Sequence, residues 1–473
     1  MPLPTWPQLR RSLPTHVQRS FPGVNRLDAF TIPDENATDI KNMTTANYPV
    51  LSTRPGFSVL GTAFAARVLG LGAWKQSELA AVANANWYRY TGGSWTSLKS
   101  GLNATNNWSF ANFHGNFSTI SLIGANGVDP VQVYDGATVS NLANAPTNAN
   151  YVEQFAERVW VMVGNDLHGC ALGNATNWAV FNGDDADPYI KTVETPAGET
   201  VIGIKAGNSH LTIFFPNTMM ELFGAVPSDF RTLPVTYDVG AVSNQAITSV
   251  EGTFYFVHQT GLFQYAGGTL PERKWSEPVQ DYIDRINPAA ISKCCAGNNG
   301  KYVYIALPLD AATEPSHIIE YNTEFGSFSV FEGFAALNMA EIKNTVYIGG
   351  VEGQVRQLGA STSDNGTPIA YRWVTKPFGA GSLSQRLRWK RAWIVADVPV
   401  GSTLTVSMSK QSSGDADWVL VQSITANTGI QSSRVIIPTS AAYNANWIRL
   451  KFEGVGPVNI YEWSREEEAL PIV

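Results

Sequence analysis

The sequence predicts an all-β protein, and three observations carry that prediction. Apolar residues make up 44% of the 473 residues, whereas charged residues make up only 15%. The 41 glycines and the frequent Asn-rich turns suit a chain of short strands joined by tight turns. The third observation is a recurring pattern, in which a β-branched or aromatic run, a short turn and a second apolar run end on an aromatic residue or Leu.

This pattern repeats at a nearly constant spacing. The residues that end it are Tyr90, Tyr134, Trp178, Phe223, Tyr265, Tyr321 and Leu358. The steps between them are 44, 44, 45, 42, 56 and 37 residues. A period of roughly 40–50 residues built from short strands is typical of a β-propeller with one blade per repeat. We therefore expect a seven-bladed β-propeller over residues 56–360, with six or eight blades as alternatives.

Each repeat should contain two clear strands. The expected pairs are 79–83 and 87–90, 119–123 and 131–134, 158–163 with a wide turn before Trp178, 211–215 and 220–223, 253–257 and 262–265, 302–307 and 318–321, and 345–348 and 355–358. An insertion from Pro308 to Pro315 accounts for the one long step. A ring of blades must also join its ends, and either residues 57–60 or residues 370–375 could add the closing strand.

The segments that flank the repeats have a different character. Residues 1–55 are rich in proline, which favours an extended arm that cannot bury a core of its own. Residues 361–369 have the composition of a linker. After it, residues 370–473 contain about six strands, which is the size and spacing of a β-sandwich. These strands are expected at 386–395, 403–407, 418–422, 434–437, 447–452 and 458–463, and the charged run at 465–468 is expected to be a solvated end.

A search for catalytic patterns gives no enzyme class. The chain lacks a Gly-x-Ser-x-Gly elbow, a His-Glu-x-x-His pair and a phosphate-binding Gly-x-x-x-x-Gly-Lys loop. Asp184, Asp185 and Asp187 form the densest acidic cluster and could hold a hard cation, but they lack the ligand series of a calcium loop. A polar turn explains them better. We therefore expect no catalytic residues, no metal and no cofactor.

Charge and hydropathy narrow the set of partners. The formal net charge of −7 argues against nucleic acid as the main ligand of the whole surface. The strongest basic run is Arg386–Arg391, in which strand alternation places Arg386 and Arg388 on one face and Leu387 and Trp389 on the other. Either the polar face of a sandwich strand or a patch for phosphate or acidic groups would explain this run. No apolar stretch reaches the roughly 18 residues of a membrane span, so none is expected.

Three segments of the N-terminal arm resemble the opening of tailed-phage virion proteins. They are Ser20-Phe-Pro-Gly-Val-Asn, Ile32-Pro-Asp-Glu-Asn-Ala-Thr-Asp-Ile-Lys-Asn-Met and Tyr48-Pro-Val-Leu-Ser-Thr-Arg-Pro-Gly56. In those proteins an irregular arm that ends in Arg-Pro-Gly leads into a β-propeller. The chain thus looks like a tail hub, a class that includes packaged-DNA stabilisation proteins and nozzle proteins of short-tailed phages.

The resemblance implies a structural role without catalysis. Such a protein forms a homo-oligomeric ring, commonly of six subunits, below the portal or adaptor in the tail or neck of the virion. It is assembled in the host cytoplasm and retains or guides the DNA, which passes without sequence-specific binding. On this interpretation the candidate assembly contacts are Arg54, Pro55, Gly56, Pro308, Pro315, Arg386 and Arg388, and deletion of residues 1–50 should spare folding but block assembly.

Two other function classes stay open. A receptor- or glycan-binding propeller would use tryptophans of the C-terminal domain, such as Trp418 and Trp447, to stack on sugar rings. A glycan-processing enzyme would have to assemble a carboxylate pair from different blades.

Overall fold

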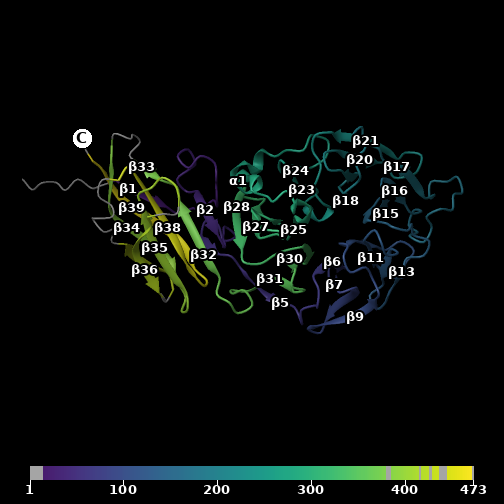
Figure 1. The fold of residues 1–473 in the computed structure, drawn as a ribbon, viewed down its shortest axis with the longest axis horizontal. Coiled ribbons are helices and arrows are strands. Elements are labelled where there is room, and N and C mark those ends of the chain that lie inside the picture. Colours follow the sequence, from purple (N-terminus) through teal and green to yellow (C-terminus); the bar gives the residue numbers. More distant parts are fainter. Residues whose placement is uncertain (1–13, 380–384, 415–416, 426–428, 436–444, 471–473) are drawn as a thin grey trace, which may run out of the picture. The chain divides into compact units, whose positions relative to one another are not determined.

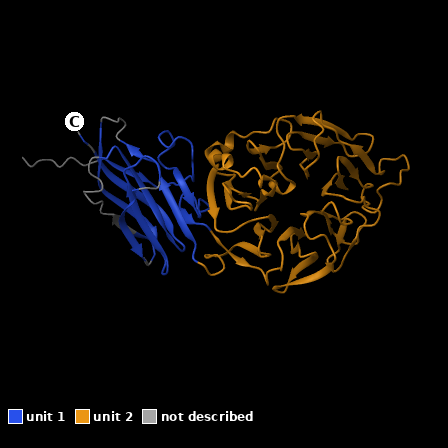
Figure 2. Ribbon diagram, viewed as in Figure 1, with its two compact units in different colours: residues 1–54, 368–473 blue, residues 55–367 orange. Residues whose placement is uncertain are grey.

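The chain folds into two compact units that are built almost entirely of strands. The computed structural model describes residues 14–379, 385–414, 417–425, 429–435 and 445–470. Unit 1 comprises Met1–Arg54 and Pro368–Val473, and unit 2 comprises Pro55–Thr367 (Figure 2). The N-terminal segment therefore belongs to the same unit as the C-terminal strands, which differs from the separate arm that the sequence suggests.

Unit 2 contains seven small antiparallel sheets within the described residues, six with four strands and one with three (Figure 1). Each sheet follows the previous one along the chain. The first four sheets consist of β6 (Val68–Trp74), β7 (Glu78–Ala83), β8 (Asn86–Thr91) and β9 (Ser94–Ser100); β10 (Ser109–Phe113), β11 (Ser121–Ala125), β12 (Gln132–Tyr134) and β13 (Val139–Asn141); β14 (Tyr151–Phe155), β15 (Arg158–Val163), β16 (Asp166–Gly169) and β17 (Tyr189–Thr192); and β18 (Gly203–Ala206), β19 (Leu211–Phe214), β20 (Met219–Phe223) and β21 (Arg231–Thr236).

The remaining three sheets complete the series. They consist of β22 (Ile247–Val250), β23 (Thr253–His258) and β24 (Gly261–Tyr265); β25 (Cys295–Asn298), β26 (Tyr302–Leu307), β27 (His317–Asn322) and β28 (Ser327–Glu332); and β29 (Asn338–Ile342), β30 (Thr345–Gly349), β31 (Val355–Ser361) and β5 (Gly56–Val59). The first strands β6, β10, β14 and β18 contact one another in that order, and so do β22, β25, β29 and β6. Residues of the fourth and fifth sheets share one core, so the series returns to its start. Figure 2 shows these sheets arranged in a ring. Unit 2 thus has a β-propeller-like all-β fold.

The strands that the sequence identifies are the second and third of each sheet. These strands are buried on both faces because neighbouring sheets pack against them, so they are apolar runs. One shared core joins Val82 and Trp87 of the first sheet to Trp108, Leu122 and Tyr134 of the second. The expected repeat is therefore explained by packing between sheets. Trp178 is the exception, since it lies in the loop between β16 and β17, whereas the other residues that mark the repeat lie in strands.

The last sheet of unit 2 is closed by a strand from the start of the unit. β5 pairs with β31 in antiparallel register, with Phe57 opposite Leu358. Of the two expected closing strands, residues 57–60 therefore provide the closure, while residues 370–375 belong to unit 1. A Cβ at Gly56 would lie only 2.2 Å from the main-chain oxygen of Ser363, so glycine is required where β5 begins.

Helical structure in the described residues is limited to short segments. They are η1 (Asn244–Ala246), η2 (Lys274–Val279), α1 (Gln280–Asp284) and η3 (Ile291–Lys293), all in unit 2. The described part of the chain contains no helix with the length and apolarity that crossing a membrane requires.

Unit 1 consists of two six-stranded antiparallel sheets in the described residues. One has the order β3-β4-β39-β34-β37 with β1 on β39, and the other has the order β2-β32-β38-β35-β36 with β33 on β38. The strands are β1 (Thr15–Gln18), β2 (Ala37–Lys41), β3 (Met43–Thr44), β4 (Leu51–Thr53), β32 (Ala370–Thr375), β33 (Phe378–Gly379), β34 (Leu387–Asp397), β35 (Thr403–Ser409), β36 (Val419–Thr425), β37 (Gln431–Val435), β38 (Trp447–Val455) and β39 (Asn459–Ala469). The six strands expected after residue 385 each match one of these, although part of the 434–437 segment lies outside the described residues.

An aromatic core joins the two sheets of unit 1. Trp463 of β39 packs on Trp389 of β34 and on Phe452 of β38, with ring centroids 6.1 and 6.2 Å apart. N-terminal residues enter the same core, since Phe21 packs on Trp373 with centroids 5.7 Å apart. The expectation of an arm outside any core is therefore wrong for residues 14–54, because their strands complete both sheets. Residues 1–13 lie outside the described part.

Candidate functional site

The centre of unit 2 is where seven sheets converge, and it is held by hydrogen bonds between neighbouring first strands. Ser109 of β10 accepts from the main-chain nitrogen of Val152 on β14, at 3.1 Å. Asn338 of β29 donates to the carbonyl oxygen of Val68 on β6, at 2.8 Å. These bonds come from polar side chains on the innermost strands, so they link one sheet to the next instead of joining strands within a sheet.

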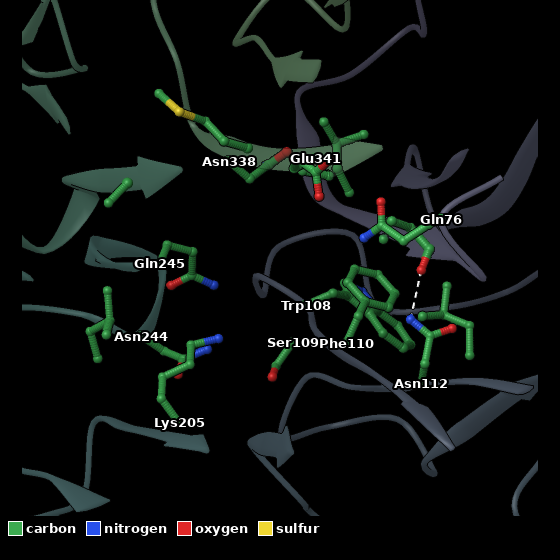
Figure 3. A pocket seen from close by; sticks show the side chains of 18 residues that line it. Gln76, Trp108, Ser109, Phe110, Asn112, Lys205, Asn244, Gln245, Asn338 and Glu341 are labelled. Atoms are coloured by element: carbon green, nitrogen blue, oxygen red, sulfur yellow. Dashed lines mark hydrogen bonds between the residues drawn. The ribbon is translucent and has the colours of Figure 1, made fainter. Parts of the chain in front are cut away.

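A polar cavity of about 260 Å³ lies between these first strands. Figure 3 shows Lys205 and Gln245 on one side and Gln76, Asn112 and Glu341 on the other. The Asn112 amide donates to the carbonyl oxygen of Ala73 at 2.7 Å, so its orientation is fixed. Amide side chains, together with one lysine and one glutamate, supply most of the polar groups that line this cavity. The cavity can therefore solvate a small polar ligand.

A second cavity of about 300 Å³ is lined by Glu153, Lys205, Asn298 and Glu341. The Lys205 Nζ lies 3.9 Å from Glu153 Oε2, which is at the outer limit of an ion pair. Burial raises the pKa of the Glu153 carboxyl, and the positive charge of Lys205 lowers it by a smaller amount. Burial and the charge of Lys205 thus act on Glu153 in opposite directions.

A buried cluster of titratable groups lies between the fourth and fifth sheets. His210 Nε2 lies 3.1 Å from Glu221 Oε1, and the Tyr265 hydroxyl donates to the same oxygen. These residues are 3%, 4% and 2% exposed, respectively. Burial lowers the pKa of His210, against the opposing effect of Glu221. The residue types of this cluster are ones that catalytic sites use. Because the cluster is buried, a substrate cannot reach it, and we interpret it as a structural network.

The acidic turn at residues 184–187 is organised around an arginine. The Asp187 carboxylate accepts hydrogen bonds from the main-chain nitrogens of Asn182 and Gly183, at 2.8 and 2.7 Å. Arg158 is fully buried and donates to the carbonyl oxygens of Asp185 and Asp187, at 2.8 and 2.6 Å. The guanidinium thus binds main-chain carbonyl oxygens of the turn, while main-chain nitrogens bind the Asp187 carboxylate. In the described residues, His, Cys, Asp and Glu side chains nowhere gather in a group of three that could hold a metal.

The residues of the Arg-Pro-Gly motif connect the two units along the chain. Arg54 is the last residue of unit 1 and Pro55 the first of unit 2. Arg54 is 2% exposed and its Nε donates to Asn42 Oδ1 at 2.8 Å. Gly56 is buried as well. Burial removes Arg54 and Gly56 from the candidate assembly contacts, and their positions point to a role in folding.

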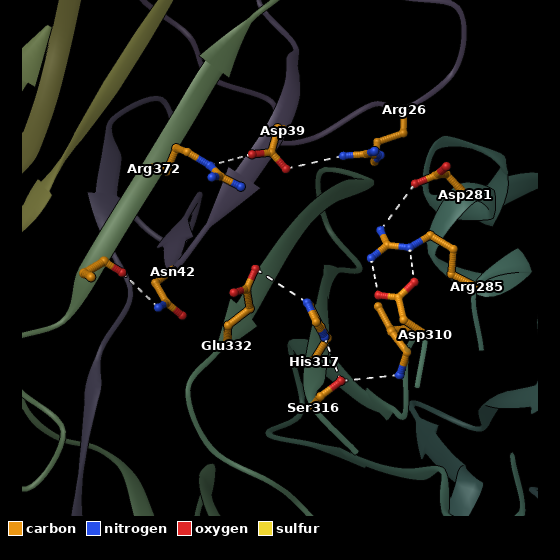
Figure 4. A network of polar contacts seen from close by, with 12 residues as sticks. Arg26, Asp39, Asn42, Asp281, Arg285, Asp310, Ser316, His317, Glu332 and Arg372 are labelled. Carbon is orange, nitrogen blue, oxygen red and sulfur yellow. Dashed lines mark hydrogen bonds and ion pairs between the residues drawn. The ribbon is translucent and has the colours of Figure 1, made fainter. Parts of the chain in front are cut away.

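Ion pairs hold both ends of the insertion from Pro308 to Pro315 against other residues of unit 2. Both prolines are buried, which disfavours them as the assembly contacts that the sequence analysis names. Asp310 accepts two hydrogen bonds from Arg285, at 2.9 and 2.7 Å, and this contact lowers the pKa of the Asp310 carboxyl (Figure 4). Glu314 pairs with Lys293 at 2.7 Å. The exposed part of the insertion therefore lies between the prolines.

The basic run lies in β34, and the acidic C-terminal run lies opposite it in the paired strand β39. Leu387 and Trp389 are buried, as strand alternation predicts, and Arg388 lies opposite Glu468 in the strand register. Lys390 pairs with Glu468 at 2.9 Å. The expectation of a solvated end at residues 465–468 is wrong, because these residues form part of β39. The acidic partners also favour the structural interpretation of the basic run. Arg386 is exposed and stays a candidate contact.

The tryptophans named for a glycan-binding role are engaged within unit 1. The Arg449 guanidinium and the Lys451 ammonium each lie 5.0 Å from the centroid of the Trp418 ring. Trp447 packs against Phe30, with ring centroids 4.8 Å apart. These contacts compete with the stacking of a sugar on either ring.

No sequence motif indicates the residues of the central cavity. Gln76 lies in a turn, Gln245 in η1 and Glu341 near the end of β29, and only the closure of the ring brings them together. Polar residues in or next to the first strands of the sheets are the sequence feature that could have indicated these cavity residues.

Comparison with known proteins gives similarity in structure only. No family model matches the chain, and no curated protein sequence matches it. The chain is similar to YCF48 from Cyanidioschyzon merolae, with 8% identity and a TM-score of 0.43 over 64% of this chain and 98% of that one. It is also similar to the computationally designed Ika8 protein, with 9% identity and a TM-score of 0.40 over 64% of this chain and 99% of that one.

A third similar structure is the extracellular domain of the putative hybrid two component system BT4673 from B. thetaiotaomicron. It shares 11% identity and a TM-score of 0.45 over 77% of this chain and 47% of that one.

Proposed function

We propose that the protein is a structural component of a phage virion, part of the tail hub, nozzle or neck ring. In this role it forms a homo-oligomeric ring of six subunits that joins the portal or adaptor and lets DNA pass without sequence-specific binding. The observation that carries the proposal is the Arg54-Pro55-Gly56 motif. This motif lies where the chain passes from unit 1 to unit 2, and its glycine begins the strand that closes unit 2. In the virion proteins that the chain resembles, the same motif leads into a propeller.

The proposal includes the architecture. The seven sheets of unit 2 are the blades of a seven-bladed β-propeller, and unit 1 is a β-sandwich that contains the N-terminal segment. Two features support a scaffold that transmits load. The closing strand β5 pairs the start of unit 2 with its last sheet, and the N-terminal strands β2 and β4 pair with the late strands β32 and β39. Pairing between residues far apart in sequence resists separation of the ends of the chain.

The alternative functions receive less support. The rings of Trp418 and Trp447 are occupied by neighbours, which disfavours the glycan-binding propeller. The cluster of His210, Glu221 and Tyr265 is buried, which disfavours an enzyme built on it.

The test has two parts. Mass spectrometry of purified virions from the phage that encodes the protein should detect the chain in several copies per particle. Electron microscopy of the purified full chain, alone and with the portal or adaptor proteins, should show closed rings. Absence from the virions, together with a free monomer in every mixture, would overturn the proposal.

A further inference from the structure

Two polar cavities adjoin at the centre of unit 2. The cavity of about 260 Å³ and the cavity of about 300 Å³ have Lys205, Ala340 and Glu341 in common in their walls. Lys205 comes from the fourth sheet and Glu341 from the seventh, and both border the space shown in Figure 3. Because these residues belong to sheets far apart in the chain, the arrangement exists only in the closed ring.

Three buried side chains in the wall of the smaller cavity have a polar atom without a partner among the described residues. These atoms are the Trp108 indole nitrogen, Asn244 Oδ1 and Asn338 Oδ1. The three residues are only 3%, 5% and 6% exposed, respectively. Asn338 Nδ2 already donates to the Val68 carbonyl oxygen, which leaves its oxygen as the unmatched group. Buried polar atoms almost always have a partner, so this wall suits a ligand with both donors and acceptors.

The described residues that line the two cavities include one lysine and two glutamates, so their charges largely cancel. The Lys205 Nζ lies 3.9 Å from Glu153 Oε2, and Glu341 accepts a hydrogen bond from the main-chain nitrogen of Asn344. A ligand that only donates, such as an alkylammonium, would leave Lys205 and the Trp108 N–H unmatched. A ligand that only accepts, such as a simple anion, would leave Glu341 and the asparagine oxygens unmatched. The wall therefore favours a neutral ligand whose groups both donate and accept.

An aromatic ring borders the same space. Phe110 lines the smaller cavity, is half-buried and stacks on Trp108, with ring centroids 6.2 Å apart. An apolar aromatic face beside a few polar groups is typical of pockets for small molecules, and the C–H face of a sugar ring packs on such a surface. A volume of about 260 Å³ accommodates one six-membered sugar ring.

We propose that this site binds a monosaccharide in its pyranose form, either as a free sugar or as the terminal residue of a glycan. Each hydroxyl of a pyranose can donate and accept, so neighbouring hydroxyls match both kinds of unmatched group. The Lys205 ammonium and the Trp108 N–H donate to the sugar. The side-chain oxygens of Asn244, Asn338 and Glu341 accept from it. The proposal does not rest on the virion role proposed above, and its site is distinct from the tryptophans of unit 1.

The first experiment measures binding to the full chain by saturation-transfer difference NMR. The probes are glucose, galactose, mannose and N-acetylglucosamine, each also as its methyl glycoside, with putrescine and acetate as charged comparisons. At least one sugar should give a signal, and the charged comparisons should give none. Equal binding of the methyl glycoside would assign the site to the end of a glycan, whereas its loss would assign the site to the free sugar.

The second experiment places the sugar in the cavity by calorimetric titration of variants. Gln245→Leu removes an amide from the wall and should weaken binding by roughly tenfold, because a hydrogen bond is lost. Gln264→Leu is the matched control, since Gln264 is half-buried like Gln245 but lines neither cavity. The control should bind like the unmodified chain. Ala340→Phe puts a ring where the two cavities adjoin and should abolish binding.

A further variant tests the class of ligand. Glu341→Gln removes the charge but keeps a group that accepts hydrogen bonds. A neutral sugar should then lose less than about tenfold in affinity, because the hydrogen bond remains. A loss well beyond this in Glu341→Gln would indicate that the charge carries the binding, which contradicts a neutral ligand.

The outcomes that overturn the proposal are definite. The proposal is wrong if no sugar binds at concentrations up to tens of millimolar, or if putrescine or acetate binds in place of the sugars. Sugar binding that both Gln245→Leu and Ala340→Phe leave unchanged would place the ligand elsewhere. Circular dichroism and melting temperature show whether each variant is folded, and Gln245→Leu decides the question if Ala340→Phe is not. Each of these results leaves the proposed virion role standing, because that role is tested on virions.

Discussion

The guanidinium of Arg158 donates to the main-chain carbonyl oxygen of Asp187 at 2.6 Å, from a fully buried position. This contact belongs to the acidic turn at residues 184–187, for which the sequence already favours a polar turn over a cation site. The guanidinium binds main-chain carbonyl oxygens of Asp185 and Asp187, and the Asp187 carboxylate accepts from the main-chain nitrogens of Asn182 and Gly183. The turn is therefore part of the fold, and it gives the exposed Val180–Phe181 segment a fixed base.

Arg158→Met should destabilise unit 2. The substitution keeps much of the side-chain volume but leaves buried carbonyl oxygens without donors, which costs roughly 1–3 kcal/mol for each group. Burial also lowers the pKa of Arg158, so part of this cost is offset by removing a desolvated charge. A net loss on the order of 3 kcal/mol is expected in urea unfolding. Arg231→Met is the control, since Arg231 is exposed, and it should change stability little. A loss as small as that of the control would show that the guanidinium does not hold the loop.

The sequence predicted the middle strands of the sheets well and their inner and outer strands poorly. β15 and β26 begin and end where the sequence places them, because strands covered on both faces are continuous apolar runs. β18 reads Gly-Ile-Lys-Ala and β25 reads Cys-Ala-Gly-Asn, which are too short and too mixed to stand out. Since the central cavity is lined by the inner strands, its residues were missed together with those strands.

Pairing over long sequence separations explains the other differences. The N-terminal segment is short of apolar residues, so it suggested an extended arm, but its strands complete sheets whose other strands lie more than 300 residues later. Likewise, the run at 465–468 is acidic enough to suggest a solvated end. It forms a strand because the basic residues of β34 face it. Local patterns cannot show either pairing.

The ion pair between Lys390 and Glu468 should contribute little to stability. Both side chains are 37% exposed, and their atoms lie 2.9 Å apart. Exposed pairs of this kind typically contribute about 0.2–1 kcal/mol. A double-mutant cycle with Lys390→Ala and Glu468→Ala should therefore give a coupling below about 1 kcal/mol that weakens in high salt. We expect solvent to screen the pair, and a larger coupling that does not depend on salt would contradict this.

Unit 2 should lose stability in mild acid through its buried histidines. His258 is 2% exposed, and burial lowers its pKa from the ordinary value of about 6.5. The unfolded chain therefore takes up a proton before the folded chain does. Stability should be intact above about pH 7 and fall as the pH drops through about 6.5 towards the lower folded-state value.

The corresponding variant is His258→Asn. The substitution removes one group that takes up a proton at a higher pH in the unfolded chain than in the folded chain. The slope of melting temperature against pH between about 5.5 and 7 should therefore become shallower. His168 and His210, whose pKa values are also lowered by burial, should maintain part of the slope. His114→Asn serves as the control because His114 is exposed. An equal slope in His258→Asn and the unmodified chain would contradict the assignment.

Deletion of residues 1–50 should now unfold unit 1, in contrast to the expectation from the sequence that it spares folding. The deletion removes β1, β2 and β3, and with them Phe21, Ile40 and Met43, which are at most 1% exposed. Burying a large apolar side chain stabilises a protein by roughly 1.5–3 kcal/mol, so losing three of them removes about 4.5–9 kcal/mol of the roughly 5–15 kcal/mol that keeps a typical domain folded. Limited proteolysis with mass spectrometry should then show rapid cleavage within 368–473 and resistance within 55–367. Deletion of residues 1–13 is the control, because it keeps every strand described here. A deletion product that resists protease throughout would show that the N-terminal strands are dispensable, and it would restore the separate arm as the better description.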